Sequence, residues 1–154
     1  MKKRDSKEST QAHRRMVAKF IFHFIWLLFK RALSHDKSKL SPEEKPGFDK
    51  YNTTLAETTY GSEQYKRNLA CLGETLKTHY RRNRHHPEFY PHGVMDMDLV
   101  DVVEMFCDWT AATKRHNDGD IFRSIKLNEK RFGLGEILAS IFKNTAERVF
   151  GEGL

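Results

Sequence analysis

Apolar residues recur along the chain every three to four positions, which is the spacing of one face of an α-helix. The clearest stripe runs through Tyr65, Leu69, Leu72 and Leu76, and no segment alternates apolar and polar residues as a strand would. The pattern therefore predicts an all-α fold, a compact bundle of about five to six helices.

Residues that start or stop helices set the expected boundaries. Ser41-Pro42-Glu43-Glu44 combines a capping box with proline at the first helical position, which predicts a helix start there. The segment His85 to Asp96 holds two prolines and a glycine and predicts a loop. The expected helices run from about 9 into the thirties, from 42 for a short stretch, and over 62–83, 98–116, 121–131 and 134–150.

The apolar run Ala18 to Phe29 is interrupted by Lys19 and His23 and is too short to cross a bilayer. Lys30-Arg31 follows it where a signal peptide would have a cleavage site. We expect a buried core helix here and no membrane association. Two cysteines without a CxxC pair indicate buried thiols and a reducing, cytoplasmic location.

Positive charge is concentrated near the start of the chain. The net charge is +6, yet residues 1–39 alone hold eleven Lys/Arg against three Asp/Glu. We expect residues 1–10 to form a flexible basic tail and residues 11–154 a single helical domain. The basic region favours either solubility alone or contact with nucleic acid.

Three separate patches carry candidate metal ligands. They are His35-Asp36, His85-His86 and Asp108, which lies in an apolar helical segment. Imidazole nitrogen and carboxylate oxygen together suit manganese, iron, cobalt, nickel or zinc, and magnesium is a further candidate. Lys39 adds a cation three places after Asp36, which favours an anionic, phosphorylated substrate. The patches predict one or two ions.

Each patch also has a plainer interpretation. Asp36 is a candidate helix cap and His35 a helix-end cation. The arginines beside His85-His86 can equally form a basic surface. Asp101, Glu104 and Asp108 share one sector of an otherwise apolar helix, and such carboxylates need a cation, hydrogen bonds or a metal.

Two other histidines, His13 and His79, are further candidate ligands. A straight helix would place His13 about 33 Å from His35, so a shared ion requires a bend between Phe20 and Leu28. His79 lies one turn before Asn83 and is left open.

The order of His13, His35-Asp36 and Asp108 resembles the pattern of the HD-domain metal-dependent phosphohydrolase superfamily, which is all-α. His35-Asp36-Lys37-Ser38-Lys39 matches its form with a lysine after the dyad, and His85-His86-Pro87-Glu88 is similar to an element of branches that hold several metals. More closely, segments 35–40, 83–88 and 104–109 resemble a family of small phage and bacterial HD-like proteins. This resemblance implies a cytoplasmic location in a bacterial or phage-infected cell, and a homodimer as a candidate assembly.

The resemblance implies hydrolysis of a nucleotide or related phosphoester by a metal-activated water. Two alternatives stay open: a non-catalytic helical module that binds nucleic acid or protein around a structural metal, and a di-iron oxidative enzyme. The expected metal ligands are His13, His35, Asp36, His85, His86 and Asp108, the catalytic residues are Asp36, Lys39 and Glu104, and the substrate-binding residues are Lys39, Arg81, Arg84 and Arg131.

Overall fold

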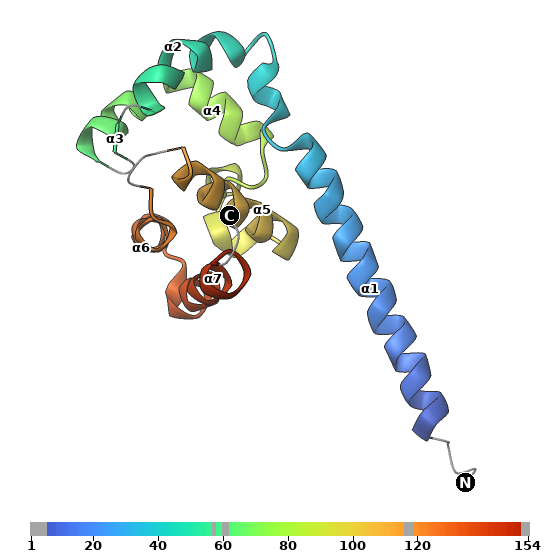
Figure 1. The fold of residues 1–154 in the computed structure, drawn as a ribbon. Helices are drawn as coiled ribbons and strands as arrows, with labels where there is room; N and C mark the ends of the chain where they lie inside the picture. Colours follow the sequence, from blue (N-terminus) through green and yellow to red (C-terminus); the bar gives the residue numbers. More distant parts are fainter. Residues whose placement is uncertain (1–5, 57, 60–61, 116–118, 152–154) are drawn as a thin grey trace. The chain divides into compact units, whose positions relative to one another are not determined.

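The computed structural model describes residues 6–56, 58–59, 62–115 and 119–151 of the 154-residue chain. Within these ranges all regular structure is helical and no strand is present (Figure 1). The prediction of an all-α fold is confirmed. The helices are α1 (Ser6–Ser34), α2 (Lys45–Ala56), α3 (Glu63–Ala70), α4 (Gly73–Arg82), α5 (Leu99–Thr113), α6 (Ile121–Phe132) and α7 (Gly135–Val149), with 3-10 turns η1 (Lys37–Leu40), η2 (Pro87–Phe89) and η3 (Gly93–Asp96).

The chain divides into two compact units, one ending at His35 and the other beginning at Asp36. The sequence predicts instead one domain over 11–154 preceded by a flexible tail. Residues 6–10 of that expected tail are the first residues of α1, and residues 1–5 lie outside the described part.

Helix α1 is a single unbroken helix of 29 residues (Figure 1). It contains no buried residue, and Phe20 and Trp26 are 65% and 54% exposed. Within its own unit α1 has no other described helix to pack against, whereas the sequence predicts a buried core helix here. The bend expected between Phe20 and Leu28 is also missing, since neither glycine nor proline interrupts the helix. No helix in the described part of the chain combines the length and the apolar content needed to cross a membrane.

The hydrophobic core of the second unit lies among α5, α6 and α7. Phe106 of α5 stacks on Phe142 of α7 with ring centroids 4.6 Å apart and an interplanar angle of 2°. Met105 and Ile125 are completely buried beside them. This packing holds α5 in place, and α5 carries Asp101, Glu104 and Asp108, which are discussed below. The buried core residues are Met105, Phe106, Trp109, Ile125, Leu134, Ala139, Phe142 and Ala146.

Helix boundaries differ from the predicted ones at two points. The helix expected over 62–83 is two helices, because the chain breaks at Cys71-Leu72 and Gly73 adopts φ 46°, a left-handed conformation that glycine takes readily. Ser41 to Glu44 form a turn instead of the first helical turn, and α2 begins at Lys45.

The cysteines also differ from the prediction of buried thiols. Cys71, at the break between α3 and α4, and Cys107, on α5, are both exposed. Cys107 takes no part in the core cluster that Phe106 and Trp109 of the same helix belong to.

Removing one core ring tests this packing. We expect Phe142→Ala to lower the free energy of unfolding by about 3–5 kcal/mol, because the mutation leaves a cavity beside Phe106 and Trp109. Ile137→Ala is the matched control on the same helix, since Ile137 is 81% exposed, and should change stability by less than about 0.5 kcal/mol. Urea denaturation of both variants gives the comparison. Equal losses would contradict the assignment of the core.

Candidate metal centre

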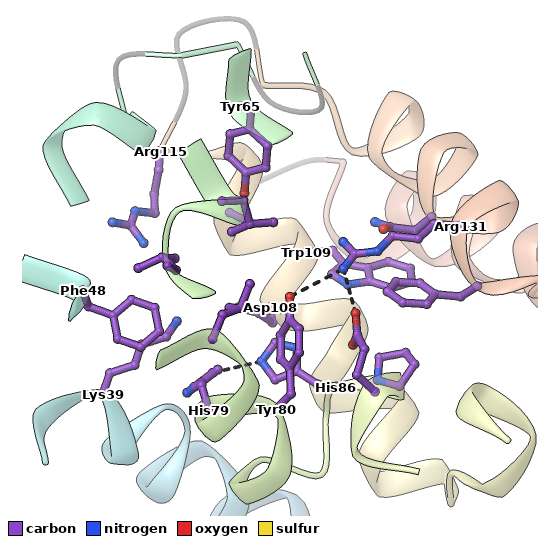
Figure 2. Close-up of a pocket in the computed structure, with 18 of the residues that line it drawn as sticks. Lys39, Phe48, Tyr65, His79, Tyr80, His86, Asp108, Trp109, Arg115 and Arg131 are labelled. Atoms are coloured by element: carbon purple, nitrogen blue, oxygen red, sulfur yellow. Dashed lines mark hydrogen bonds and ion pairs between the residues drawn. The ribbon is translucent and has the colours of Figure 1, made fainter. Parts of the chain in front are cut away.

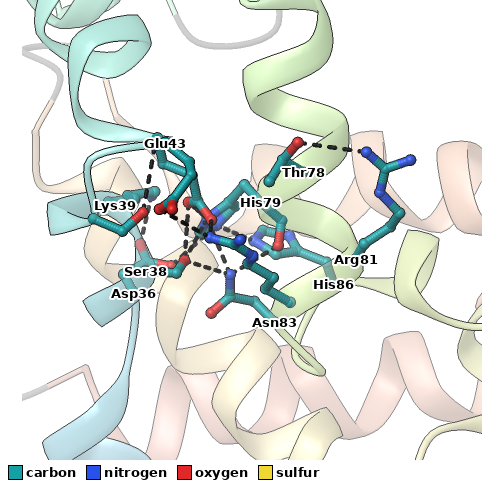
Figure 3. Close-up of polar contacts among 12 residues, drawn as sticks. Asp36, Ser38, Lys39, Glu43, Thr78, His79, Arg81, Asn83 and His86 are labelled. Atoms are coloured by element: carbon teal, nitrogen blue, oxygen red, sulfur yellow. Dashed lines mark hydrogen bonds and ion pairs between the residues drawn. The ribbon is translucent and has the colours of Figure 1, made fainter.

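Four side chains of the second unit place one potential ligand atom each around a common point. They are Asp36, His79, His85 and His86, and the four atoms all lie within 4.8 Å of one another. Asp36 precedes η1, His79 is on α4, and the two adjacent histidines are in the loop between α4 and η2. The view in Figure 3 shows Asp36, His79 and His86 side by side. Residues remote in the sequence therefore meet at one site.

The backbone at Asp36 is unusual. Its φ of 53° and ψ of 12° lie in the left-handed region, which no other non-glycine residue adopts in the described part of the chain. This conformation costs most L-residues about 1–2 kcal/mol and is best tolerated by glycine, asparagine and aspartate. Lys39 follows in η1 and donates from Nζ to Asp36 Oδ2, so the other oxygen, Oδ1, faces the histidines.

The distances between these atoms fit a metal site. His79 Nε2 lies 3.0 Å from His86 Nε2 and 3.2 Å from Asp36 Oδ1, and His85 Nε2 lies 3.5 Å from the same oxygen. Metal–nitrogen bonds of 2.0–2.1 Å place two tetrahedral ligands about 3.3 Å apart and two neighbouring octahedral ligands roughly 3.0 Å apart. The observed spacings are those of either geometry.

Buried or nearly buried carboxylates lie behind two of the imidazoles. Glu44 Oε2 is 2.8 Å from His79 Nδ1, and Glu104 Oε1 is 3.3 Å from His85 Nδ1. A carboxylate that accepts a hydrogen bond from Nδ1 of an imidazole leaves the lone pair of Nε2 available to the site. Carboxylate–histidine pairs of this kind are the usual support of metal-binding imidazoles.

His86 is held in its neutral form. Burial lowers its pKa to about 2, and the neighbouring His85 and His79 act in the same direction. Neutral imidazole is the form that binds a metal ion. His86 is therefore ready to act as a ligand across the whole physiological pH range.

A cavity of about 420 Å³ adjoins the cluster. His79 and His86 line it, and so does Asp108 of α5, whose carboxylate offers an oxygen within 4.8 Å of one from Asp36. In Figure 2 these residues lie together at the centre of the view. A small molecule in the cavity would thus contact His79, His86 and Asp108 directly. The cavity's other charged and aromatic lining residues are Lys39, Lys45, Phe48, Asp49, Tyr65, Tyr80, Glu88, Trp109, Arg115, Arg131 and Phe132.

Two of the four cations expected to bind substrate line this cavity. Lys39 lies beside Asp36, and Arg131 pairs with Glu88 at 2.7 Å. The described lining includes neither Arg81, which donates to Thr78, nor Arg84.

Arg84 instead fixes the loop that carries His85. Its guanidinium donates to both oxygens of Asp101, at 3.2 and 2.9 Å, and to Asp98 at 3.1 Å. Tyr90 also donates to Asp101, which is completely buried and forms a capping box with Asp98 at the start of α5. Burial opposes ionisation of Asp101, but the hydrogen bonds from Arg84 and Tyr90 outweigh it and hold its pKa below the usual range.

The remaining predicted ligands are two histidines of the first unit. His13 and the end of α1 are roughly 30 Å apart along an unbroken helix. The expectation that His13 and His35 hold one ion is therefore wrong. His35 is the last residue of the first unit, so the centre described here is built from the second unit alone.

Sequence reasoning left His79 open and did not identify Glu44. His79 continues the predicted stripe of Leu69, Leu72 and Leu76 at helical spacing, and this signal places it on the inner face of α4. No comparable signal exists for Glu44, because a glutamate at that place in Ser41-Pro42-Glu43-Glu44 also satisfies a capping box.

The fold and the site together define an all-α protein with a candidate centre of three imidazoles and one carboxylate at the wall of a cavity. Residues 2–150 match the model of the family described as "Family of unknown function (DUF5662)". The chain belongs to that family. No curated protein and no solved structure matches it.

The clamp between Arg84 and Asp101 predicts a pH-dependent stability difference. Because the folded pKa of Asp101 is lowered, its contribution is fully present above the unfolded value of about 3.9 and is lost as the pH falls through the folded pKa. We expect Asp101→Asn to cost about 2 kcal/mol at pH 7 and progressively less below pH 4, measured by urea denaturation. Asp49→Asn, at an exposed carboxylate, is the control. A difference that does not change with pH would contradict an ionised Asp101.

Proposed function

We propose that the protein is a metal-dependent phosphohydrolase that acts on a nucleotide or related phosphoester. The proposal rests on one observation. Potential ligand atoms of Asp36, His79, His85 and His86 converge on a common point, and this point lies at the wall of a cavity that lysine and arginine side chains also line. Mixed nitrogen and oxygen ligands suit manganese, iron, cobalt, nickel or zinc. The resemblance to HD-domain phosphohydrolases supports the same reaction class.

The site is better suited to catalysis than to a purely structural metal. Four protein ligands close a tetrahedral ion, whereas a six-coordinate ion such as manganese would keep two positions open toward a substrate. Here the cavity reaches His79, His86 and Asp108. A divalent ion bound there would supply a Lewis acid and lower the pKa of water toward neutrality. Asp108 is a candidate further ligand because of its distance to Asp36, and His35 is another on the sequence alone.

The chain's own residues account for binding and orientation. Lys39 Nζ, next to Asp36, is placed to neutralise a phosphate, and Glu104 orients the His85 imidazole. Arg131 lies on the other side of the cavity in Figure 2 and supplies a second cation.

Aromatic rings give the cavity a surface for a planar group. The rings of Trp109 and Phe132 are nearly parallel, with an interplanar angle of 7°, and Tyr80 packs 4.7 Å from His86 between them and the cluster. Any of the nucleobases can stack on an aromatic side chain, because each has a flat π-face. Rings on one side and cations near the metal ligands together favour a nucleotide over an unsubstituted phosphate.

Metal content and phosphate release test the proposal directly. We expect the purified protein to bind at least one divalent ion and to release phosphate from nucleotides supplied with manganese. Asp36→Asn should reduce metal affinity and activity by at least about tenfold, while asparagine remains compatible with the left-handed backbone. Asp96→Asn is the control, because Asp96 pairs with the exposed His92. Turnover that survives Asp36→Asn would overturn the assignment.

A second experiment separates the cations that line the cavity from those that do not. We expect Arg131→Ala to raise KM for a nucleotide substrate by about tenfold or more, since a charge-assisted hydrogen bond contributes about 1.5–3 kcal/mol. Arg81→Ala removes an equally positive side chain outside the described lining and should leave KM unchanged. Steady-state kinetics give the comparison. An equal effect in both variants would indicate a general charge effect instead of a subsite.

A further inference from the structure

Glu44 is a completely buried carboxylate in the turn before α2. Its Oε2 lies 2.8 Å from His79 Nδ1 and accepts a hydrogen bond from Ser38 Oγ at 2.9 Å. Its other oxygen, Oε1, has a cation only at 3.6 Å, on Arg82, a side chain that is 45% exposed. The most buried acid in the neighbourhood of the cluster is thus directed at one of the imidazoles.

Two further side chains surround Glu44 and the Nδ1 atom of His79. Asn83 donates from Nδ2 to Ser38 Oγ at 2.8 Å and to the backbone oxygen of His79 at 2.8 Å. His79 Nδ1 also lies 3.0 Å from Asn83 Nδ2 and 3.2 Å from Ser38 Oγ. Ser38 in turn donates to Glu44. The network joins η1, the turn before α2 and the end of α4, and it surrounds the Nδ1 side of His79 (Figure 3).

A carboxylate is unfavourable in a buried place unless hydrogen bonds or charges compensate the loss of hydration. Oε1 of Glu44 has no hydrogen-bond partner among the described residues, and Arg82 approaches it only to 3.6 Å. A glutamine of the same shape would fill the same space. Packing alone therefore does not account for a carboxylate at this position.

We infer that Glu44 is a positioning residue that sets the tautomer and orientation of His79 for metal binding, an inference that rests on the proposed metal centre. In this role the carboxylate accepts a hydrogen bond from Nδ1–H, so that Nε2 directs its lone pair at the point shared with His86 Nε2 and Asp36 Oδ1. A glutamine at position 44 can donate to Nδ1 instead. That tautomer carries its proton on Nε2, which then blocks the metal position.

The test is a titration of the metal-free protein with cobalt(II) in competition with a chelator. We expect Glu44→Gln to weaken cobalt binding by about 10–100-fold, with a thermal midpoint of the metal-free protein equal to or above that of the wild type. Glu43→Gln is the matched control, since Glu43 lies next to Glu44 and contacts the same Arg82 at 3.6 Å but is exposed. It should bind cobalt like the wild type.

A double-mutant cycle shows whether Glu44 acts through His79. We expect Glu44→Gln to cause no further loss of cobalt affinity in a His79→Ala background, because the imidazole it positions is gone. Losses that simply add would overturn the inference, and so would wild-type affinity in Glu44→Gln.

These outcomes are distinct from failure of the proposed function. A wild-type protein that binds cobalt with the expected dependence on Glu44 but releases no phosphate would contradict the phosphohydrolase and leave the role of Glu44 standing. A wild-type protein that binds no divalent ion would overturn both.

Discussion

The orientation of buried imidazoles by carboxylates is the constraint on which this site depends. His79 and His85 are both almost completely buried, and each has an acid at its Nδ1, Glu44 for one and Glu104 for the other. A buried imidazole must place both ring nitrogens, and an acceptor at one nitrogen decides what the other can do. Two such pairs pointing inward leave an electron-rich point that a cation can occupy.

Helix α5 connects this centre to the stability of the second unit. Glu104 and Asp108 lie one turn apart on it and face the histidines and Asp36. The adjacent positions Met105 and Trp109 are buried in the core with α6 and α7. Because α5 carries both the core residues and the acidic residues, packing of the core fixes the positions of Glu104 and Asp108. The cap formed by Asp98 and Asp101 ties its first turn to the loop of His85.

Much of the fold and part of the site followed from local sequence patterns. Helical periodicity predicted the all-α class, and unusual pairs such as His35-Asp36 and His85-His86 pointed to a metal. The break between α3 and α4 at Gly73 is not predictable from the sequence pattern, because a stripe of apolar residues crosses it without interruption. The burial of Glu44 beside the cluster is not predictable either, because it depends on contacts with η1 and α4 that no local sequence pattern encodes. The prediction that His13 shares an ion with His35 required a bend in α1, and no glycine or proline lies between the two histidines to cause one.

The left-handed backbone of Asp36 places two separate demands on one position. The proposed metal centre requires an oxygen ligand at this position. The backbone requires a short side chain that tolerates positive φ. Glutamate supplies an oxygen but tolerates positive φ poorly. Alanine and valine supply no oxygen and also tolerate positive φ poorly. Over evolutionary time this leaves asparagine and glycine as the replacements the turn accepts most easily. Relatives that keep the fold without the proposed metal centre should carry one of these two residues at this position.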